Sequence, residues 1–326
     1  MFRYFIFILI MLSAIVSKAQ FDTNYVHLTK NSFSAYPMAE SAYMELRFSD
    51  LDLNNKIYSS TLTSRNTTSL GFGMSFYRVG FSLSFQLPVT NVPELENSKA
   101  FSFAGGYSYH RFYGELRYRD YIGFQKSVLI HDSLKGDVNI RKDIEMRQIG
   151  VALDYFFSKK YNFDASYKNY NVQKKSAATF LLIGGINRYD FFGKYLFSDS
   201  MHYASNIEFV REMDVWAFKL APGGAFTLTY KGLYVSSLAS LGIAFNNSNM
   251  FGDDNEVNVN SWAPAFEARA VVGYNSRKWF ASLSLNIEND YFFYDKIDLS
   301  VTNVYFNLKA GYKFNSKYLG KLGKYL

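Results

Sequence analysis

Hydrophobic and polar positions alternate along most of this chain, and the clearest example ends near residue 288. Between 262 and 274, apolar side chains alternate with polar ones that include Glu267 and Arg269. A polar turn follows at 275–278, and the alternation resumes over 279–288. A period of two places successive side chains on opposite faces of a strand. The pattern therefore predicts a β-hairpin with one apolar face and one polar face.

The same pattern predicts further strands over 57–64, 70–76, 81–87, 101–109, 111–121, 147–157, 161–171, 215–230, 233–246 and 304–314. One face of the 111–121 strand carries Glu115, Arg117 and Arg119, which would be costly to bury in a dry core. A watery lumen lowers that cost. The sequence therefore predicts an all-β, antiparallel up-and-down transmembrane β-barrel of about twelve strands, within a range of about ten to fourteen. This count assumes that 41–50 lies outside the wall and that 172–213 contains no spanning strand.

The two ends of the chain lie outside the predicted barrel. Residues 1–19 combine a basic start, a short apolar stretch and small residues before Gln20, so they are interpreted as a cleaved signal peptide. Residues 20–40 are expected to form a periplasmic N-terminal segment, 41–314 the β-barrel domain, and 315–326 a C-terminal tail. The five short turns are expected on the periplasmic side, with the long connections opposite.

Composition agrees with a barrel in the outer membrane. The chain is 48% hydrophobic, yet its mean hydropathy is only -0.12, which suits strands with one polar face better than apolar helices. It has no Cys, so disulfides and thiol ligands are excluded. The net charge is +7, but the basic residues are scattered without a nucleic-acid-binding motif. Basic pairs at turns, such as Lys159-Lys160 and Arg277-Lys278, favour contact with anionic lipid headgroups instead.

Charged residues expected to face the lumen are the candidate binding site. The strongest candidates are Glu115, Arg117, Arg119, Glu267 and Arg269. A wider set with the same orientation adds Glu45, Arg47, Glu288, Lys309 and Lys313. The mixture of signs leaves two interpretations open. The lumen is either a polar conduit for a solute, or a cross-braced plug that stiffens the wall.

Catalysis has little support in the sequence. Ser108 and His110 share one strand face, and a lipid hydrolase would need such a pair oriented by a third group. However, alternation places that face inside the barrel, His110 falls at a turn, and a lipid substrate would approach from outside. No His pair has metal-ligand spacing, and no phosphate or dinucleotide motif occurs. We therefore expect a non-catalytic protein without cofactor or metal. A lipid-modifying barrel enzyme and a soluble secreted β-sandwich that binds a partner remain the alternatives.

Several segments resemble a barrel family of Bacteroidota, the domain of unknown function family 4421. The best match is Gln173-Lys174-Lys175-Ser176-Ala177 leading into Phe180 to Gly185, with Tyr161-Asn162-Phe163 before it. Further matches are Gly71-Phe72-Gly73, Gly273-Tyr274-Asn275 and Gly311-Tyr312-Lys313-Phe314. The chain departs from the family pattern at Ala178, where Gly is expected, and at Arg65-Asn66, which replaces Pro-Asn.

The resemblance covers roughly 40–314 and implies an outer-membrane β-barrel with no established activity, so it assigns no functional residues. The closing Gly311 to Phe314 is similar to the signal that the barrel-assembly machinery recognises. We therefore expect outer-membrane lipids and that machinery as partners, and a pore, a transporter or a surface scaffold as the function.

Overall fold

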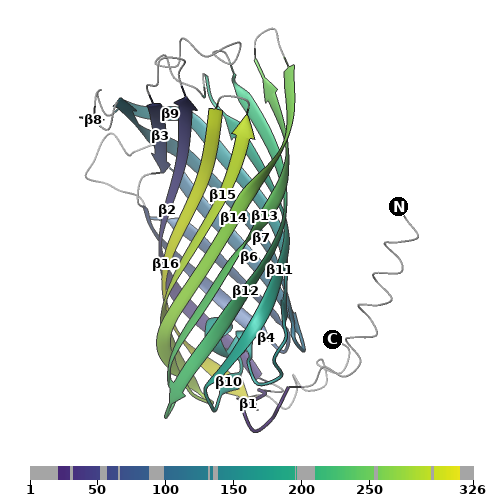
Figure 1. Ribbon diagram of the computed structural model, residues 1–326. Helices are drawn as coiled ribbons and strands as arrows, with labels where there is room; N and C mark the ends of the chain where they lie inside the picture. Colours follow the sequence, from purple (N-terminus) through teal and green to yellow (C-terminus); the bar gives the residue numbers. More distant parts are fainter. Residues whose placement is uncertain are drawn as a thin grey trace.

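Strands joined edge to edge close this chain into a barrel (Figure 1). The computed structural model describes residues 21–29, 32–51, 57–64, 67–87, 99–130, 133–134, 139–194, 196, 210–252, 256–294 and 297–315. The wall consists of β2 (Ser32–Leu51), β3 (Ile57–Ser64), β4 (Thr67–Phe76), β5 (Val79–Gln86), β6 (Lys99–Tyr109), β7 (Phe112–Ile130), β9 (Asn139–Phe156), β11 (Ala177–Phe192), β12 (Glu212–Tyr230), β13 (Leu233–Phe251), β14 (Glu256–Asn275), β15 (Trp279–Tyr294) and β16 (Ile297–Asn315). Three short strands are not members of the ring: β1 (Val26–His27) and β10 (Val172–Gln173) pair with each other, and β8 (Ser133–Leu134) pairs with β7.

Every wall pairing is antiparallel, and β16 closes the ring by pairing with β2. The first half of β2 pairs with β4, and its second half pairs with β3. Likewise, β7 pairs first with β6 and then with β3. The ring therefore has twelve strands at the end where β4, β5 and β6 lie, and ten at the other end, where β3 alone joins β2 to β7. The predicted antiparallel barrel of about twelve strands is confirmed.

The strands that make up the count differ from the expected ones. Residues 161–171 form no wall strand, and β9 pairs with β11 instead. β11 and β2 are both wall strands, and β2 begins at Ser32, before the expected barrel boundary at 41. Because β3 and β4 lie end to end along β2, they occupy one position in the ring. These errors cancel in the total.

Residues 161–171 lie at one end of the barrel and include η2 (Asp164–Lys168), a single turn of π-helix. They lie inside the ring, because their side chains contact inward residues of β7, β13 and β14. We call residues 161–171 the plug. Among the described residues, no helix has the length and apolar character needed to cross a membrane.

Four of the five predicted turns join neighbouring wall strands at the plug end, which we call the turn end; they connect β4 to β5, β6 to β7, β12 to β13 and β14 to β15. Three of them contain residues with positive φ, namely Tyr77, His110 and Lys231, and Gly232 follows Lys231 with φ 88°. Tight hairpins favour this backbone conformation because its twist matches that of the strands. The opposite end, where β13 is followed by β14 and β15 by β16, is called the loop end.

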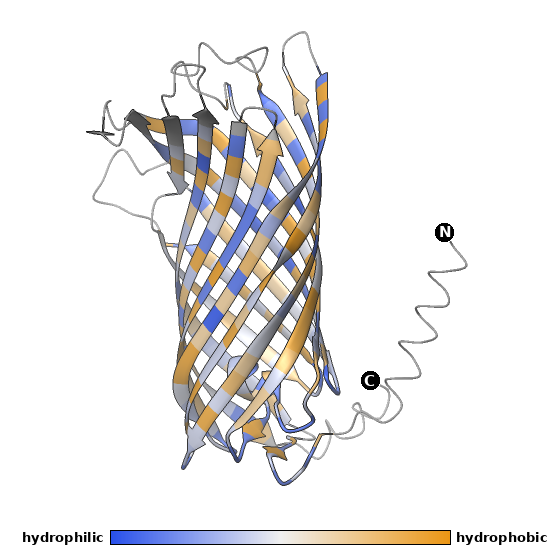
Figure 2. Cartoon of the chain, viewed as in Figure 1, coloured by the Kyte–Doolittle hydropathy of each residue, from blue (hydrophilic) through white to orange (hydrophobic). Residues whose placement is uncertain are grey.

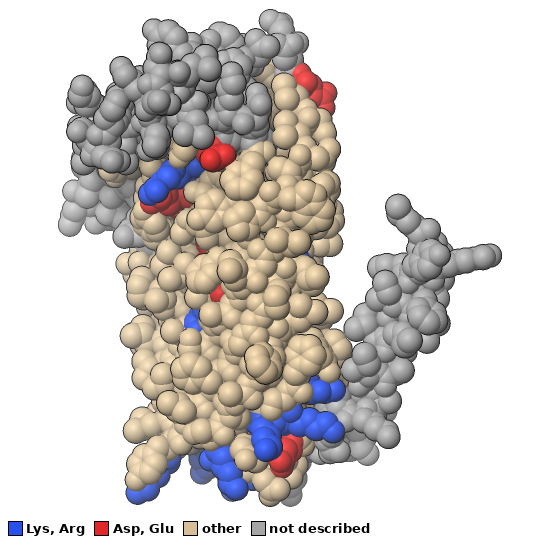
Figure 3. Space-filling model, in the orientation of Figure 1, with Lys and Arg blue, Asp and Glu red and all other residues tan. Residues whose placement is uncertain are grey.

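An apolar belt covers the outside of the barrel near the turn end. Its members are more than a third exposed and lie on strands around the whole ring; they include Leu70, Phe85, Leu116, Val151, Phe180, Leu220, Leu241, Phe266, Leu283 and Leu308. Figure 2 shows hydrophobic positions along these strands, and the middle of the visible wall in Figure 3 is largely free of charged side chains. An exposed apolar surface that surrounds a closed barrel is suited to lipid rather than to water.

The polarity of the wall inverts toward the loop end, which corrects the expected orientation of Glu45 and Arg47. Along β2, Met44 and Leu46 point inward and are buried, whereas Glu45 and Arg47 face outward and form an ion pair at 2.9 Å. The inward side chains pack into an apolar core of 21 buried residues contributed by strands around the ring. We call this the loop-end core. Where lipid no longer covers a barrel, water solvates its outside and its interior is free to fill with packed apolar side chains.

Candidate functional site

The five candidate lumen residues lie together in one buried layer across the barrel. Glu115, Arg117 and Arg119 point inward from β7, and Glu267 and Arg269 point inward from β14. Arg269 joins the two groups, because its Nη2 lies 2.6 Å from Glu267 Oε1 and 3.6 Å from Glu115 Oε2. Each of the five side chains is at most 10% exposed. The inward orientation predicted from alternation is therefore confirmed for all of them.

Glu288 connects this layer across the lumen. Its carboxylate accepts from Arg117 Nη1 and lies 3.3 Å from Arg119 Nη1. Glu288 belongs to β15, which is six steps from β7 around the ring through β9, β11, β12, β13 and β14. In a ring of twelve, these strands face one another, so the ion pairs span the full lumen. We call the residues joined in this way the charged layer.

Two members of the charged layer were missed in the sequence. Lys219 on β12 lies 3.3 Å from Glu267 Oε2, and its alternation between Phe218 and Leu220 was a usable signal for an inward side chain. Lys168 in the plug lies 3.2 Å from Glu115 Oε1. The alternating pattern could not show that Lys168 joins the charged layer, because it predicted residues 161–171 as a strand of the wall and not as a segment inside the barrel.

The plug fills the lumen below the charged layer. Asn275 Nδ2 donates to the backbone oxygens of Ala165 and Asn171, at 2.9 and 2.8 Å. Asn169 donates to Tyr234 Oη at 2.6 Å. Aromatic side chains of the plug stack with one another and with inward residues of β7 and β9; these include Phe163, Tyr161, Tyr167, Tyr113 and Phe156. Such satisfied polar groups and stacked rings hold the plug in the turn-end mouth.

The charged layer is closed on its other side by aromatic residues. The Arg119 guanidinium lies 4.1 Å from the centre of the Tyr305 ring, and Tyr121 Oη donates to Tyr305 Oη at 3.4 Å. Both tyrosines belong to the loop-end core. The plug, the charged layer and the loop-end core thus follow one another along the lumen.

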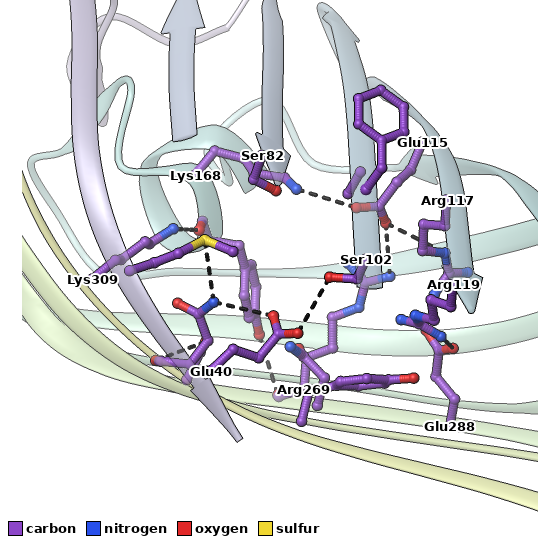
Figure 4. A pocket seen from close by; sticks show the side chains of 18 of the residues that line it. Glu40, Ser82, Ser102, Glu115, Arg117, Arg119, Lys168, Arg269, Glu288 and Lys309 are labelled. Carbon is purple, nitrogen blue, oxygen red and sulfur yellow. Dashed lines mark hydrogen bonds and ion pairs between the residues drawn. The ribbon is translucent and has the colours of Figure 1, made fainter. Parts of the chain in front are cut away.

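A cavity of about 140 Å³ remains beside the charged layer (Figure 4). It lies against β2, β5, β6 and β16, where the wall contributes short side chains such as Ser82 and Ser102. Glu40 on β2 reaches this space and accepts from Ser84 Oγ and Ser102 Oγ at 3.3 Å each. The labelled side chains in Figure 4 are polar or charged and line the cavity together with a few apolar residues such as Met38 and Ala104.

Comparison with known proteins places the chain in a family. Residues 20–314 match the model of the family described as Domain of unknown function (DUF4421). The chain belongs to the DUF4421 family. No curated protein matches it.

Solved structures similar to this DUF4421 chain include outer-membrane β-barrels. The outer membrane protease OmpT from Escherichia coli is 8% identical, with 90% of this chain and 100% of that chain covered and a TM-score of 0.40. The translocator domain of the autotransporter NalP from Neisseria meningitidis is 9% identical, with coverage of 85% and 88% and a TM-score of 0.33. Likeness at this level bears on neither activity nor ligand.

Ser108 and His110, the candidate pair for catalysis, do not form a dyad in this DUF4421 chain. Ser108 Oγ donates to Asp164 Oδ1 in the plug at 2.5 Å. His110 lies in the β6–β7 turn, with its ring 4.2 Å from that of Tyr109. Burial lowers the pKa of His110, and the nearby Arg78 and Arg111 lower it further. Among the described residues, no hydrogen bond joins Ser108 to His110, and no three His, Cys, Asp or Glu side chains are arranged to hold a metal ion.

Asp164 should make the free energy of unfolding depend on pH. Burial raises its pKa to about 6, although the hydrogen bond from Ser108 opposes this shift. A carboxyl whose folded pKa exceeds its unfolded value contributes stability at low pH, and that contribution is lost as pH rises through the folded pKa. We expect the unfolding free energy of the wild type to fall by about 1–3 kcal/mol between pH 4 and pH 8 because of this group.

The Asp164→Asn variant should lack this component. Its unfolding free energy should exceed that of the wild type at pH 8 and approach it at pH 4, as measured by urea unfolding at both pH values. Equal pH dependence in the two proteins would show that Asp164 keeps an ordinary pKa.

Proposed function

We propose that this chain is an integral outer-membrane β-barrel that acts as a surface scaffold, without catalysis and without a conducting lumen. The cross-lumen ion pairing of Glu288 with Arg117 and Arg119 is the observation that carries this proposal. A solute that crossed the lumen would have to separate these buried pairs, and breaking one is costly in a low-dielectric interior. It would also have to displace the plug and the loop-end core. Of the two interpretations left open by the sequence, the cross-braced lumen is therefore favoured.

The exterior supports an orientation with the turn end in the periplasm. The turn end carries exposed basic side chains from three connections between wall strands, including Lys159, Lys160, Lys174, Lys175, Lys231, Arg277 and Lys278. Lys and Arg gather at this end of the visible face in Figure 3. Anionic phospholipid headgroups attract such a rim. The basic tail residues Lys317, Lys321 and Lys324 lie outside the described residues.

The outward surface at the loop end supports the scaffold role. On β13 and β14, Asn247 Nδ2 donates to Asn260 Oδ1 at 2.9 Å, and Asn258 donates to Asn249. On β11 and β12, Arg188 pairs outward with Asp190 and Asp214. Amide ladders and ion pairs of this kind are suited to water. The wall of the barrel therefore continues beyond the apolar belt as a polar column that could present binding surfaces outside the cell.

Planar-bilayer recording on the refolded full-length chain tests the closed lumen. We expect no stepwise ion current, because three layers of packed side chains fill the lumen. Heat-modifiable gel migration of the same sample should show that the barrel is folded, and a general porin in the same bilayers serves as the positive control. Regular current steps from the folded protein would contradict the closed lumen and would favour the interpretation of the lumen as a pore.

A further inference from the structure

The cavity beside the charged layer exists because one sector of the wall lacks large inward side chains. Inward positions of β5 and β6 around the cavity carry Ser82, Ser102 and Ala104. Ser102 Oγ and Ser84 Oγ lie 2.6 Å apart and share the Glu40 carboxylate, so this sector is already hydrogen-bonded. The space of about 140 Å³ is several times what one water molecule needs. We call it the lumen chamber.

The lumen chamber has more cationic than anionic lining groups. Five cationic side chains line it, against three carboxylates, which leaves a formal excess of two positive charges; the lining groups are Arg117, Arg119, Lys168, Arg269 and Lys309, and Glu40, Glu115 and Glu288. A buried charge without a partner is costly, so an excess of one sign in an enclosed space favours a ligand of the opposite sign.

Lys309 differs from the other lining cations because its described partners are a backbone oxygen and the Tyr36 ring, whose centre lies 5.4 Å from Nζ, and not a carboxylate. It is 8% exposed, and its Nζ donates to the backbone oxygen of Tyr167 at 2.6 Å. An ammonium group has three donors, and among the described residues this one donates to a backbone oxygen and to no carboxylate. Arg117 Nη2 is also buried without a hydrogen-bond partner among the described residues, so the positive charge beside the chamber is incompletely paired.

The lumen chamber is blind toward the loop end and continues toward the turn end. A smaller cavity of about 30 Å³ shares Tyr36, Ser82, Ala104 and Lys168 with it and extends to the Tyr77–Arg78 turn. On the other side, the contact between Tyr121 and Tyr305 and the loop-end core close the lumen. A ligand would therefore enter from the turn end and leave by the same route.

We propose that the lumen chamber binds a small oxyanion, a phosphate or carboxylate group that enters from the turn end. Lys309 Nζ supplies the charge, and the Ser82 hydroxyl supplies a further hydrogen bond. This site adds a ligand to the scaffold proposed above. The anion site does not depend on whether the loop end binds a partner. The scaffold proposal and the anion-site proposal can therefore fail separately.

Calorimetric titration of the purified full-length barrel in detergent with inorganic phosphate, and separately with acetate, tests the site. The wild type should bind at least one of these anions at a single saturable site per chain. Lys309→Met should weaken binding at least tenfold. Lys313→Met is the matched control, because Lys313 lies on the same strand and face but donates to Asn275 Oδ1 and Ser276 O, at 2.7 and 2.9 Å, outside the chamber. Its affinity should equal that of the wild type.

A second variant tests the space rather than the charge. Ala104→Leu would fill the neck shared by the two cavities without changing any charged group, and it should also abolish binding. Heat-modifiable migration confirms that each variant is folded. Titration with dihexanoyl phosphatidic acid tests whether the bound phosphate can belong to a lipid headgroup. If inorganic phosphate binds and this lipid does not, the ligand is a free anion. Absence of saturable binding of both anions to the wild type, or equal affinity in wild type, Lys309→Met and Ala104→Leu, overturns the proposal.

Discussion

Replacing Glu288 with alanine should lower the free energy of unfolding by about 3–5 kcal/mol, the loss expected when one partner of a buried ion pair is removed. Arg117 and Arg119 are 4% and 8% exposed, and both direct a guanidinium at this carboxylate from the opposite side of the barrel. Without Glu288, two buried cations would share the remaining acceptors Glu115 and Gln148. Urea unfolding in phospholipid vesicles, followed by tryptophan fluorescence, measures the change.

The matched control is Glu145→Ala, which removes a carboxylate from an ion pair on the outside of β9. Glu145 Oε1 lies 2.6 Å from Arg147 Nη2, but the two side chains are 30% and 39% exposed. Exposed pairs contribute only about 0–1 kcal/mol, because water solvates each charge when the pair is broken. If Glu288→Ala were as mild as Glu145→Ala, the lumen would be hydrated at the level of Glu288, and the argument for a closed barrel would fail.

The sequence was sufficient to predict the part of the fold that lipid would cover. In β14 and β15, side chains such as Leu283 and Leu285 face outward while Glu267 and Glu288 face inward, because apolar and polar environments lie on opposite sides of a thin wall. Alternation therefore gave the correct orientation for all five candidate residues. It could not identify their partners. Arg117 and Glu288 are 171 positions apart, and their contact depends on the register of six successive strand pairs.

Two features were misjudged because the same residue pattern occurs in two environments. On β2, Met44 and Leu46 alternate with Glu45 and Arg47 as in the belt, but the apolar residues face a packed interior rather than lipid. Periodicity gives two faces and does not say which one is outside. The plug was mistaken for a strand because its aromatic residues are spaced like those of the wall. Its asparagines were the missed signal, since Asn162 Oδ1 accepts from the backbone N–H of Ala165 and Asn169 Nδ2 donates to a tyrosine hydroxyl inside the barrel.

Single-cysteine labelling should separate these two environments on intact cells, and the expected difference is close to all-or-none. The natural chain has no Cys, so each variant carries one thiol. Arg47→Cys should react with a membrane-impermeant charged maleimide, because the Arg47 side chain is 52% exposed on the loop-end surface. Leu46→Cys should react at least about tenfold more slowly, because a thiol in the buried loop-end core is inaccessible to the reagent. Mass spectrometry of the purified barrel measures the labelled fraction.

Two further variants fix the membrane position and the orientation of the same wall. Leu220→Cys lies in the apolar belt at a position that is 53% exposed in the protein, yet it should stay unlabelled because lipid would cover it. Lys278→Cys at the turn end should react only after the outer membrane is permeabilised. Labelling of Leu220→Cys in intact cells would mean that water covers the belt, and labelling of Lys278→Cys there would reverse the orientation. Either result would remove the basis for a loop end that stands outside the cell, whereas the expected set leaves the polar column of β11 to β14 as the surface available to a partner.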